Sequence, residues 1–180
     1  RVVAPNGREW ENDDALPLYA IESSTDSALT VSFESAGTAR IYVSSYGSGE
    51  SGSYSLRISE AGDGRADLPA VPIRPGREVQ GELTSNDYRA GRGPADVYVT
   101  SGRAGEAVRV SLRSEDFDTV LRVAADNGDS ASSDDHSANF DLPADTDSGL
   151  TFQFWEDGNL YIFVEAYGSD ERGRYVLDLE

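Results

Sequence analysis

The sequence predicts an all-β protein, an antiparallel and jelly-roll-like β-sandwich in a tandem repeat. Strong hydrophobic patterns have period 2: Leu150, Phe152 and Phe154 alternate with polar residues, as strands with one buried face require. Gly, Asp and Asn separate these runs and are typical of turns. The chain also matches itself at a spacing of 121 residues. Together these observations favour short strands packed in two sheets.

The self-match aligns residues 1–59 with residues 122–180 without a gap. It contains 23 identities in 59 pairs, and Thr-Asp-Ser occurs at 25–27 and again at 146–148. Patterned sequence precedes only the second copy, at residues 77–121, so we interpret residues 1–60 as the C-terminal half of a first repeat. Residues 61–76 are rich in Pro and Gly and predict a linker. Residues 77–180 then form the complete second repeat.

The expected strands of the second repeat follow from its alternating runs and the turns between them. They lie near 78–84, 95–101, 107–114, 117–125, 149–155, 160–167 and 173–179. The first repeat shows the same alternation at 29–33 and 54–58. A hairpin turn is expected at 156–159, where Asp157-Gly158 can supply a positive φ.

Composition excludes several classes of protein. The chain has a formal net charge of −18 and shows no basic patch, so it repels phosphate and is not expected to bind nucleic acid. No apolar run approaches the roughly 18 residues that cross a bilayer, so membrane insertion is not expected. The absence of Cys excludes disulfides and thiolate chemistry.

Four carboxylates predict a structural calcium site in the second repeat. Asp116 and Asp118 stand beside an expected strand start, and Asp134 and Asp135 follow one hairpin later. Calcium takes six to eight oxygen ligands, and carboxylates on neighbouring loops can converge on one ion. The alternative interpretation is that these residues are solvated or belong to turns.

Four aromatic residues are candidates for binding a polysaccharide or a protein polymer. They are Trp10, which we expect in a loop, with Trp155, Tyr161 and Tyr167. Trp155 is opposite in parity to Phe154 and is therefore expected to face outward. The alternative is that these rings pack against the sandwich or cover its edge.

No residue is predicted to be catalytic. His136 is the single imidazole of the chain and follows two Asp residues, but no Gly-x-Ser-x-Gly motif accompanies it. A solvated loop histidine is the alternative to a metal or acid-base role. We expect the protein not to be an enzyme.

The combination of motifs in the second repeat resembles the bacterial pre-peptidase C-terminal domain family. The motifs are Asp-Phe-Asp-Thr-x-Leu at 116–121, the pair Asp134-Asp135 and the strand that begins at Gly158. The family pattern usually has Asn before the Asp pair, which Asn12 matches and Ser133 does not. The resemblance implies a secreted bacterial β-sandwich that accompanies an exported protease or hydrolase without catalysing its reaction. Related collagen-binding modules imply calcium binding.

Two functions are therefore expected. The first is an accessory module that aids secretion or binds a polymer, with a parent hydrolase or neighbouring domain upstream of Arg1. The alternative is a structural subunit of an extracellular assembly or filament, because half a sandwich leaves an apolar face uncovered. The missing half from upstream, the same half of another chain through self-association, or the full repeat could cover that face.

Overall fold

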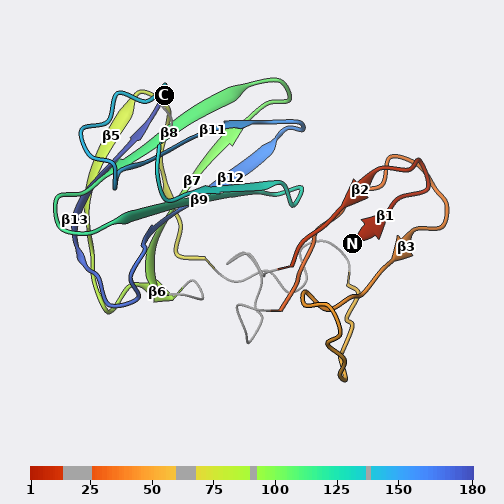
Figure 1. Ribbon diagram of the computed structural model, residues 1–180. Helices are drawn as coiled ribbons and strands as arrows, with labels where there is room; N and C mark the ends of the chain where they lie inside the picture. The colour runs from red at the N-terminus through yellow and green to blue at the C-terminus, as the bar shows by residue number, and fades with distance from the viewer. Residues whose placement is uncertain (14–25, 60–67, 90–92, 137–138) are drawn as a thin grey trace. The chain divides into compact units, whose positions relative to one another are not determined.

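The computed structural model describes residues 1–13, 26–59, 68–89, 93–136 and 139–180 (Figure 1). The chain forms two compact units, Arg1–Ala66 (unit 1) and Asp67–Glu180 (unit 2). The described residues form three sheets, mostly antiparallel, which confirms the all-β prediction. They include no helix that is long and apolar enough to span a bilayer.

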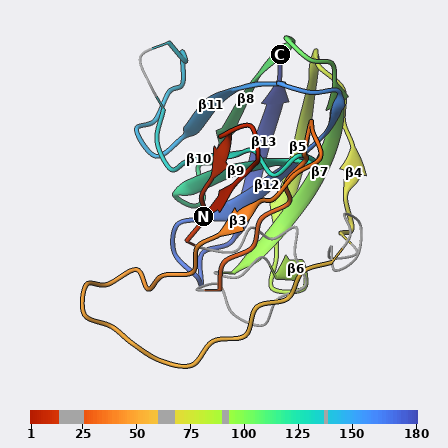
Figure 2. The same cartoon turned by 90° about the vertical axis from the view of Figure 1, so that its right-hand side faces the viewer.

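Unit 2 consists of two sheets. The first has the order β10-β9-β12-β7-β4, with β6 also paired to β7; the second has the order β11-β8-β13-β5, so β13 lies between β8 and β5 (Figure 2). The first sheet comprises β4 (Val71–Pro72), β6 (Tyr88–Arg89), β7 (Pro94–Gly102), β9 (Thr119–Ala125), β10 (Ser130–Ser133) and β12 (Gly158–Ala166). The second comprises β5 (Arg77–Leu83), β8 (Ala107–Arg113), β11 (Ser148–Gln153) and β13 (Gly173–Leu179).

The core of unit 2 lies between these sheets and is built from alternate residues of their strands. Both sheets contribute side chains with no exposed surface: Leu121 and Val123 from β9, Ile162 and Val164 from β12, Val110 and Leu112 from β8, and Leu177 and Leu179 from β13. Burying each such side chain stabilises the fold by roughly 1.5–3 kcal/mol. The period-2 pattern therefore marks the residues that hold the two sheets together.

The seven strands expected in the second repeat are all present, with ends that differ by at most two residues. The predicted linker differs, since β4 lies inside residues 61–76 and pairs in parallel with β7. Ile73 is buried in the core of unit 2, so this part of the segment belongs to that unit. Residues 60–67 lie outside the described part of the chain.

The prediction that Gly158 supplies a positive φ in the hairpin turn before β12 is wrong. Gly158 is not among the residues with positive φ; it begins β12 and pairs with Gly102. Gly128, at the turn between β9 and β10, has φ 91° and supplies the conformation that favours glycine.

Unit 1 contains one small sheet with the order β2-β1-β3, formed by Glu9–Trp10, Val2–Val3 and Arg40–Ile41. Its register equals that of β10-β9-β12 at the 121-residue spacing: Val2 pairs with Trp10 and Ile41, and Val123 pairs with Ala131 and Ile162. The strands expected at 29–33 and 54–58 are not formed. Their counterparts β11 and β13 pair only with β8 and β5, which have no counterpart in residues 1–59.

Candidate functional site

Three of the four predicted calcium ligands lie near one another, where β9 begins and β10 ends. Antiparallel pairing of these strands places Asp118 near Asp134 and Asp135, and the loop after β12 adds Glu171. Burial raises the pKa of Asp118 above its ordinary value, and the charges of Glu171, Asp135 and Asp134 raise it further. This acidic cluster therefore carries unrelieved repulsion. Sequence reasoning missed Glu171, which is far from the others along the chain.

The fourth predicted ligand, Asp116, has a structural contact instead. Its Oδ2 accepts a hydrogen bond of 2.8 Å from the backbone N of Arg174, at the start of β13. A Cβ on Gly173 would lie 2.3 Å from the Cβ of Asp116, so glycine is required for this close approach. Asp116 therefore ties the β8–β9 connection to β13.

The acidic cluster does not form a preassembled metal site. Among the residues that the structure describes, no three His, Asp or Glu side chains are gathered closely enough to hold a metal ion. Calcium requires several oxygen ligands at once, and the carboxylates as they lie do not supply them. The cluster could receive a cation only if its side chains moved closer together.

The four predicted aromatic residues do not form a single platform. Trp155 is 65% exposed before β12, and Tyr167 is exposed after it, so the nine residues of the strand separate them by roughly 30 Å. Tyr161 lies on β12 itself and is partly buried. The outward orientation predicted for Trp155 is confirmed.

Trp10 is a buried residue of unit 1 and belongs to strand β2, so the expectation of a loop is wrong. Its ring packs edge-on against Phe33 with 6.3 Å between ring centroids, and the guanidinium of Arg8 lies over it. Such a ring contributes to packing. The alternative interpretation of packing therefore describes Trp10.

Hydrogen bonds hold the hairpin that carries Trp155. Phe154 accepts a bond of 2.7 Å from the backbone N of Gly105 and donates one of 2.8 Å to Glu106, and Asp157 accepts one from Ala104. These bonds join the hairpin to the loop between β7 and β8. Trp155 is thus an exposed aromatic side chain on a fixed backbone.

His136 contacts backbone, and this contact connects it to a buried carboxylate. Its Nδ1 lies 2.9 Å from the backbone O of Asp147. The Asp147 side chain is buried and accepts hydrogen bonds from the backbone N of Ser114 and of Ala144. Next to it, the hydroxyls of Thr119 and Ser148 lie 2.7 Å apart. The sequence signal for this network was the identical Thr-Asp-Ser at 25–27 and at 146–148.

A second polar network lies inside the sandwich. The hydroxyl of Tyr175 donates to Asp96 and lies 2.7 Å from the hydroxyl of Tyr98, which joins β13 to β7. Burial raises the pKa of Asp96, and the hydrogen bond from Tyr175 offsets part of that effect. A Cβ on Gly81 would lie 2.2 Å from the Tyr175 ring, so glycine on β5 makes room for the tyrosine.

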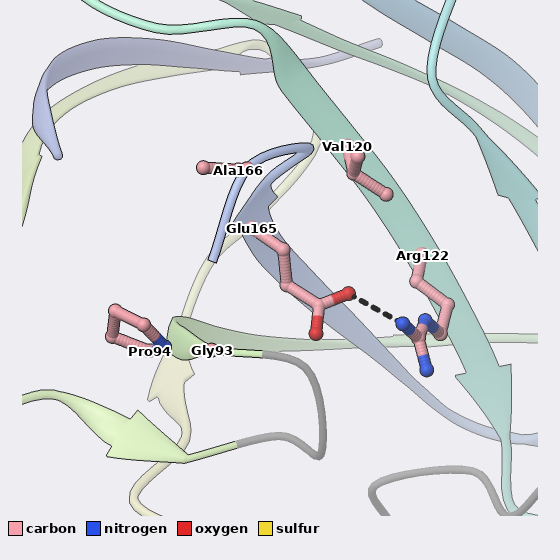
Figure 3. Close-up of a pocket in the computed structure, with 7 residues that line it drawn as sticks. Gly93, Pro94, Val120, Arg122, Glu165 and Ala166 are labelled. Carbon is pink, nitrogen blue, oxygen red and sulfur yellow. Dashed lines mark ion pairs between the residues drawn. The ribbon is translucent and has the colours of Figure 1, made fainter. Parts of the chain in front are cut away.

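An ion pair lies in a small pocket on the outer face of the first sheet. Figure 3 shows Arg122 of β9 and Glu165 of β12 pointing toward one another, with 2.9 Å between Arg122 Nη2 and Glu165 Oε2. The side chains are 18% and 5% exposed. Gly93, Pro94 and Val120 also line this pocket, which has room for about one water molecule. A pocket of this size favours a structural role.

The chain matches no protein-family model and no curated protein. Its structure is similar to the pre-peptidase C-terminal domain of a collagenase from Bacillus anthracis, with 16% identity and a TM-score of 0.48, over 64% of this chain and 98% of that domain. It is also similar to a periplasmic inhibitor of g-type lysozyme from Aeromonas hydrophila, with 12% identity and a TM-score of 0.41, over 63% and 97% of the two chains.

Proposed function

We propose that the protein is a non-catalytic, secreted accessory module of an exported bacterial protease or hydrolase, and that unit 2 binds a polymeric substrate. The observation that carries this proposal is Trp155, an exposed indole on a hydrogen-bonded hairpin. A large apolar ring is stabilised when a partner covers it. The motifs that resemble the pre-peptidase C-terminal family lie in the same unit and support the choice of function.

Cosedimentation tests the binding proposal. The full chain is mixed separately with insoluble collagen and with an insoluble polysaccharide such as chitin. We expect it to pellet with one of them, and Trp155→Ala to abolish binding while Tyr167→Ala, at the other end of β12, preserves it. Unchanged binding by Trp155→Ala, or no binding to either polymer, would contradict the proposal.

Calcium stabilisation belongs to the same proposal. Burial and then the charges of neighbouring carboxylates raise the pKa of Asp118, and a bound cation would relieve the repulsion among these carboxylates, which supports the proposal. Millimolar calcium should then raise the melting temperature of the wild type and leave that of Asp118→Asn unchanged. Equal shifts in Asp118→Asn and in the wild type would show that the acidic cluster is not the site.

A second function is favoured by unit 1. We propose that residues 1–59 are the C-terminal half of a sandwich repeat, and that the protein assembles outside the cell by completing this half with strands of another chain. The shared register of β2-β1-β3 and β10-β9-β12 supports the repeat. Light scattering over a range of concentrations tests assembly, and a strictly monomeric mass would contradict it.

A further inference from the structure

The same hairpin turn occurs in both units, and each time it carries the dipeptide Asn-Gly. Asn6-Gly7 lies between β1 and β2, and Asn127-Gly128 lies between β9 and β10, at the 121-residue spacing. Glycine has no Cβ to shield its backbone nitrogen, so that nitrogen can attack the side chain of the preceding asparagine. Asn-Gly is therefore a dipeptide that the chain itself can modify.

The backbone of the two turns is the same. The backbone N of Gly7 donates to Ala4 O and that of Gly128 donates to Ala125 O, both at 3.0 Å. The two glycines have φ of 87° and 91°. These features define a β-turn followed by a left-handed glycine, a common hairpin loop. Any difference in reactivity must then come from the side chains and from the strands around the turn.

The two asparagine side chains are held differently. Both accept a backbone hydrogen bond of 3.0 Å at Oδ1, from Arg8 N in unit 1 and from Asp129 N in unit 2. The Nδ2 of Asn127 also donates to Asp129 Oδ2 at 2.8 Å. The Nδ2 of Asn6 donates to Glu34 Oε2 at 3.4 Å, which is a weaker bond. Asn6 is exposed and Asn127 is partly buried, so Asn6 is held less firmly.

The strand that follows each turn also differs in length. β2 has two residues and β10 has four. Attack on the asparagine side chain requires the turn to leave its hydrogen-bonded conformation, so the reaction proceeds from a locally opened state. Opening is easier where fewer backbone hydrogen bonds must break. The turn in unit 1 should therefore reach the reactive conformation more often.

We propose that Asn6-Gly7 is a site of spontaneous deamidation, and that Asp129 and the longer hairpin protect the equivalent Asn127-Gly128. The backbone N of Gly7 loses its proton and bonds to Cγ of Asn6, and the side-chain amide leaves as ammonia. Water then opens the succinimide. Attack at Cγ breaks the new N–Cγ bond and gives aspartate, and attack at the backbone carbonyl carbon breaks the original peptide bond to Gly7 and gives isoaspartate. Water enters, ammonia leaves, and no oxidant or reductant is needed.

Deamidation changes both the charge and the backbone of the turn in unit 1. The new carboxylate replaces the amide that donates to Glu34, so two like charges face one another. Isoaspartate also adds a methylene group to the backbone of a turn that sets Val2 opposite Trp10. Pairing of β1 with β2 should weaken as the protein ages.

Ageing of the full chain in mildly alkaline buffer provides the test. Cleavage after arginine releases residues 2–8, which contain Asn6, and residues 123–172, which contain Asn127. Mass spectrometry with fragmentation then follows the loss of each amide. We expect Asn6 to convert severalfold faster than Asn127, with both isoaspartate and aspartate as products. In denaturing urea the two rates should converge, because the folded turns no longer protect either residue.

Three variants separate the steps. Asp129→Ala removes the acceptor for Asn127 Nδ2 and should raise the rate at Asn127 severalfold, whereas Asp129→Asn retains an acceptor oxygen and should keep that rate low. Both should leave the rate at Asn6 unchanged. In urea, Gly7→Ala should slow conversion of Asn6, because a Cβ then shields the attacking nitrogen.

Four results would overturn the proposal: equal rates at the two sites in the folded chain, faster conversion of Asn127, no response of Asn127 to Asp129→Ala, and aspartate as the sole product. Neither polymer binding nor assembly enters these measurements. Failure of either proposed function therefore leaves the expected rates as they are.

Discussion

Residues 1–59 and 122–180 share 23 identities in 59 pairs, yet several described apolar residues of the first segment are exposed where their counterparts in the second are buried. Tyr54 and Tyr175 occupy equivalent positions and differ from mostly exposed to buried. This difference in burial comes from β5, β7 and β8. These three strands pair with strands of residues 122–180, and residues 1–59 contain no counterparts of them. An alternating pattern therefore specifies a strand only when a neighbour is present to pair with it.

The largest expected difference between the units concerns equivalent arginines. Arg122→Met should destabilise unit 2 by roughly 3–5 kcal/mol, because it removes the guanidinium from a largely buried ion pair with Glu165. Arg1→Met removes an exposed pair with Glu9 at 3.4 Å and should cost less than about 1 kcal/mol. Urea denaturation followed by circular dichroism measures both. Adding Glu165→Leu to Arg122→Met should restore most of the loss, and a loss for Arg122→Met as small as that for Arg1→Met would break the comparison.

Equivalent leucines give the next largest difference. Leu177→Ala should destabilise unit 2 by about 2–5 kcal/mol, because it leaves a cavity at a fully buried position. Leu56→Ala should change the free energy of unfolding by less than about 0.5 kcal/mol, because Leu56 is already exposed. Thermal melts of the two variants provide the measurement. Similar losses in the two would mean that unit 1 buries Leu56 in solution.

The equivalent tyrosines test the polar network inside the sandwich. Tyr175→Phe removes the hydrogen bond to Asp96 and should cost about 1–3 kcal/mol, since it leaves a partly buried carboxyl without that donor. Tyr54→Phe should leave stability unchanged, because the ring of Tyr54 is exposed. Chemical denaturation compares the pair. If Tyr175→Phe behaves like Tyr54→Phe, the network does not contribute to stability.

The smallest expected effect concerns Asp118, which has no counterpart in unit 1. Its pKa is raised on folding, so the folded state binds the proton of Asp118 more tightly than the unfolded state does. The resulting gain in the free energy of unfolding is fully present below the ordinary pKa of 3.8 and is lost as the pH rises through the pKa of the folded state. Ionised Asp118 therefore destabilises unit 2 at neutral pH. Asp118→Asn should stabilise it there by about 0.5 kcal/mol, and this gain should disappear below pH 3.8. Melting temperatures from pH 3 to pH 8, with Asp141→Asn as the control, measure the effect; a gain independent of pH would contradict it.

Most of unit 2 could be predicted from the sequence because its core alternates with period 2. The pattern at Leu150, Phe152 and Phe154 identified β11, and the spacing of Tyr175, Leu177 and Leu179 identified the buried face of β13. The same reasoning failed at residues 29–33 and 54–58, because local pattern contains no information about a missing partner strand. Short edge strands such as β4 and β6 lack enough residues to show a period.

The candidate site was predictable only in part. Adjacent strands brought Asp118 and Asp134 together, since pairing of β9 with β10 follows from a hairpin. Glu171 and Asp96 were missed because their partners come from strands distant in sequence. The sequence did not reveal that the candidate aromatic residues lie apart from one another. Trp155 and Tyr167 lie at opposite ends of one strand, β12.

The central place of β13 in its sheet has a kinetic consequence. β13 pairs with β5 along its whole length, with Arg77 in register with Leu179, and it also pairs with β8. Neither β5 nor β8 can complete the sheet before residues 173–179 arrive, and pairing over such long loops slows folding. Unit 2 should therefore complete its fold only after its last strand has left the ribosome.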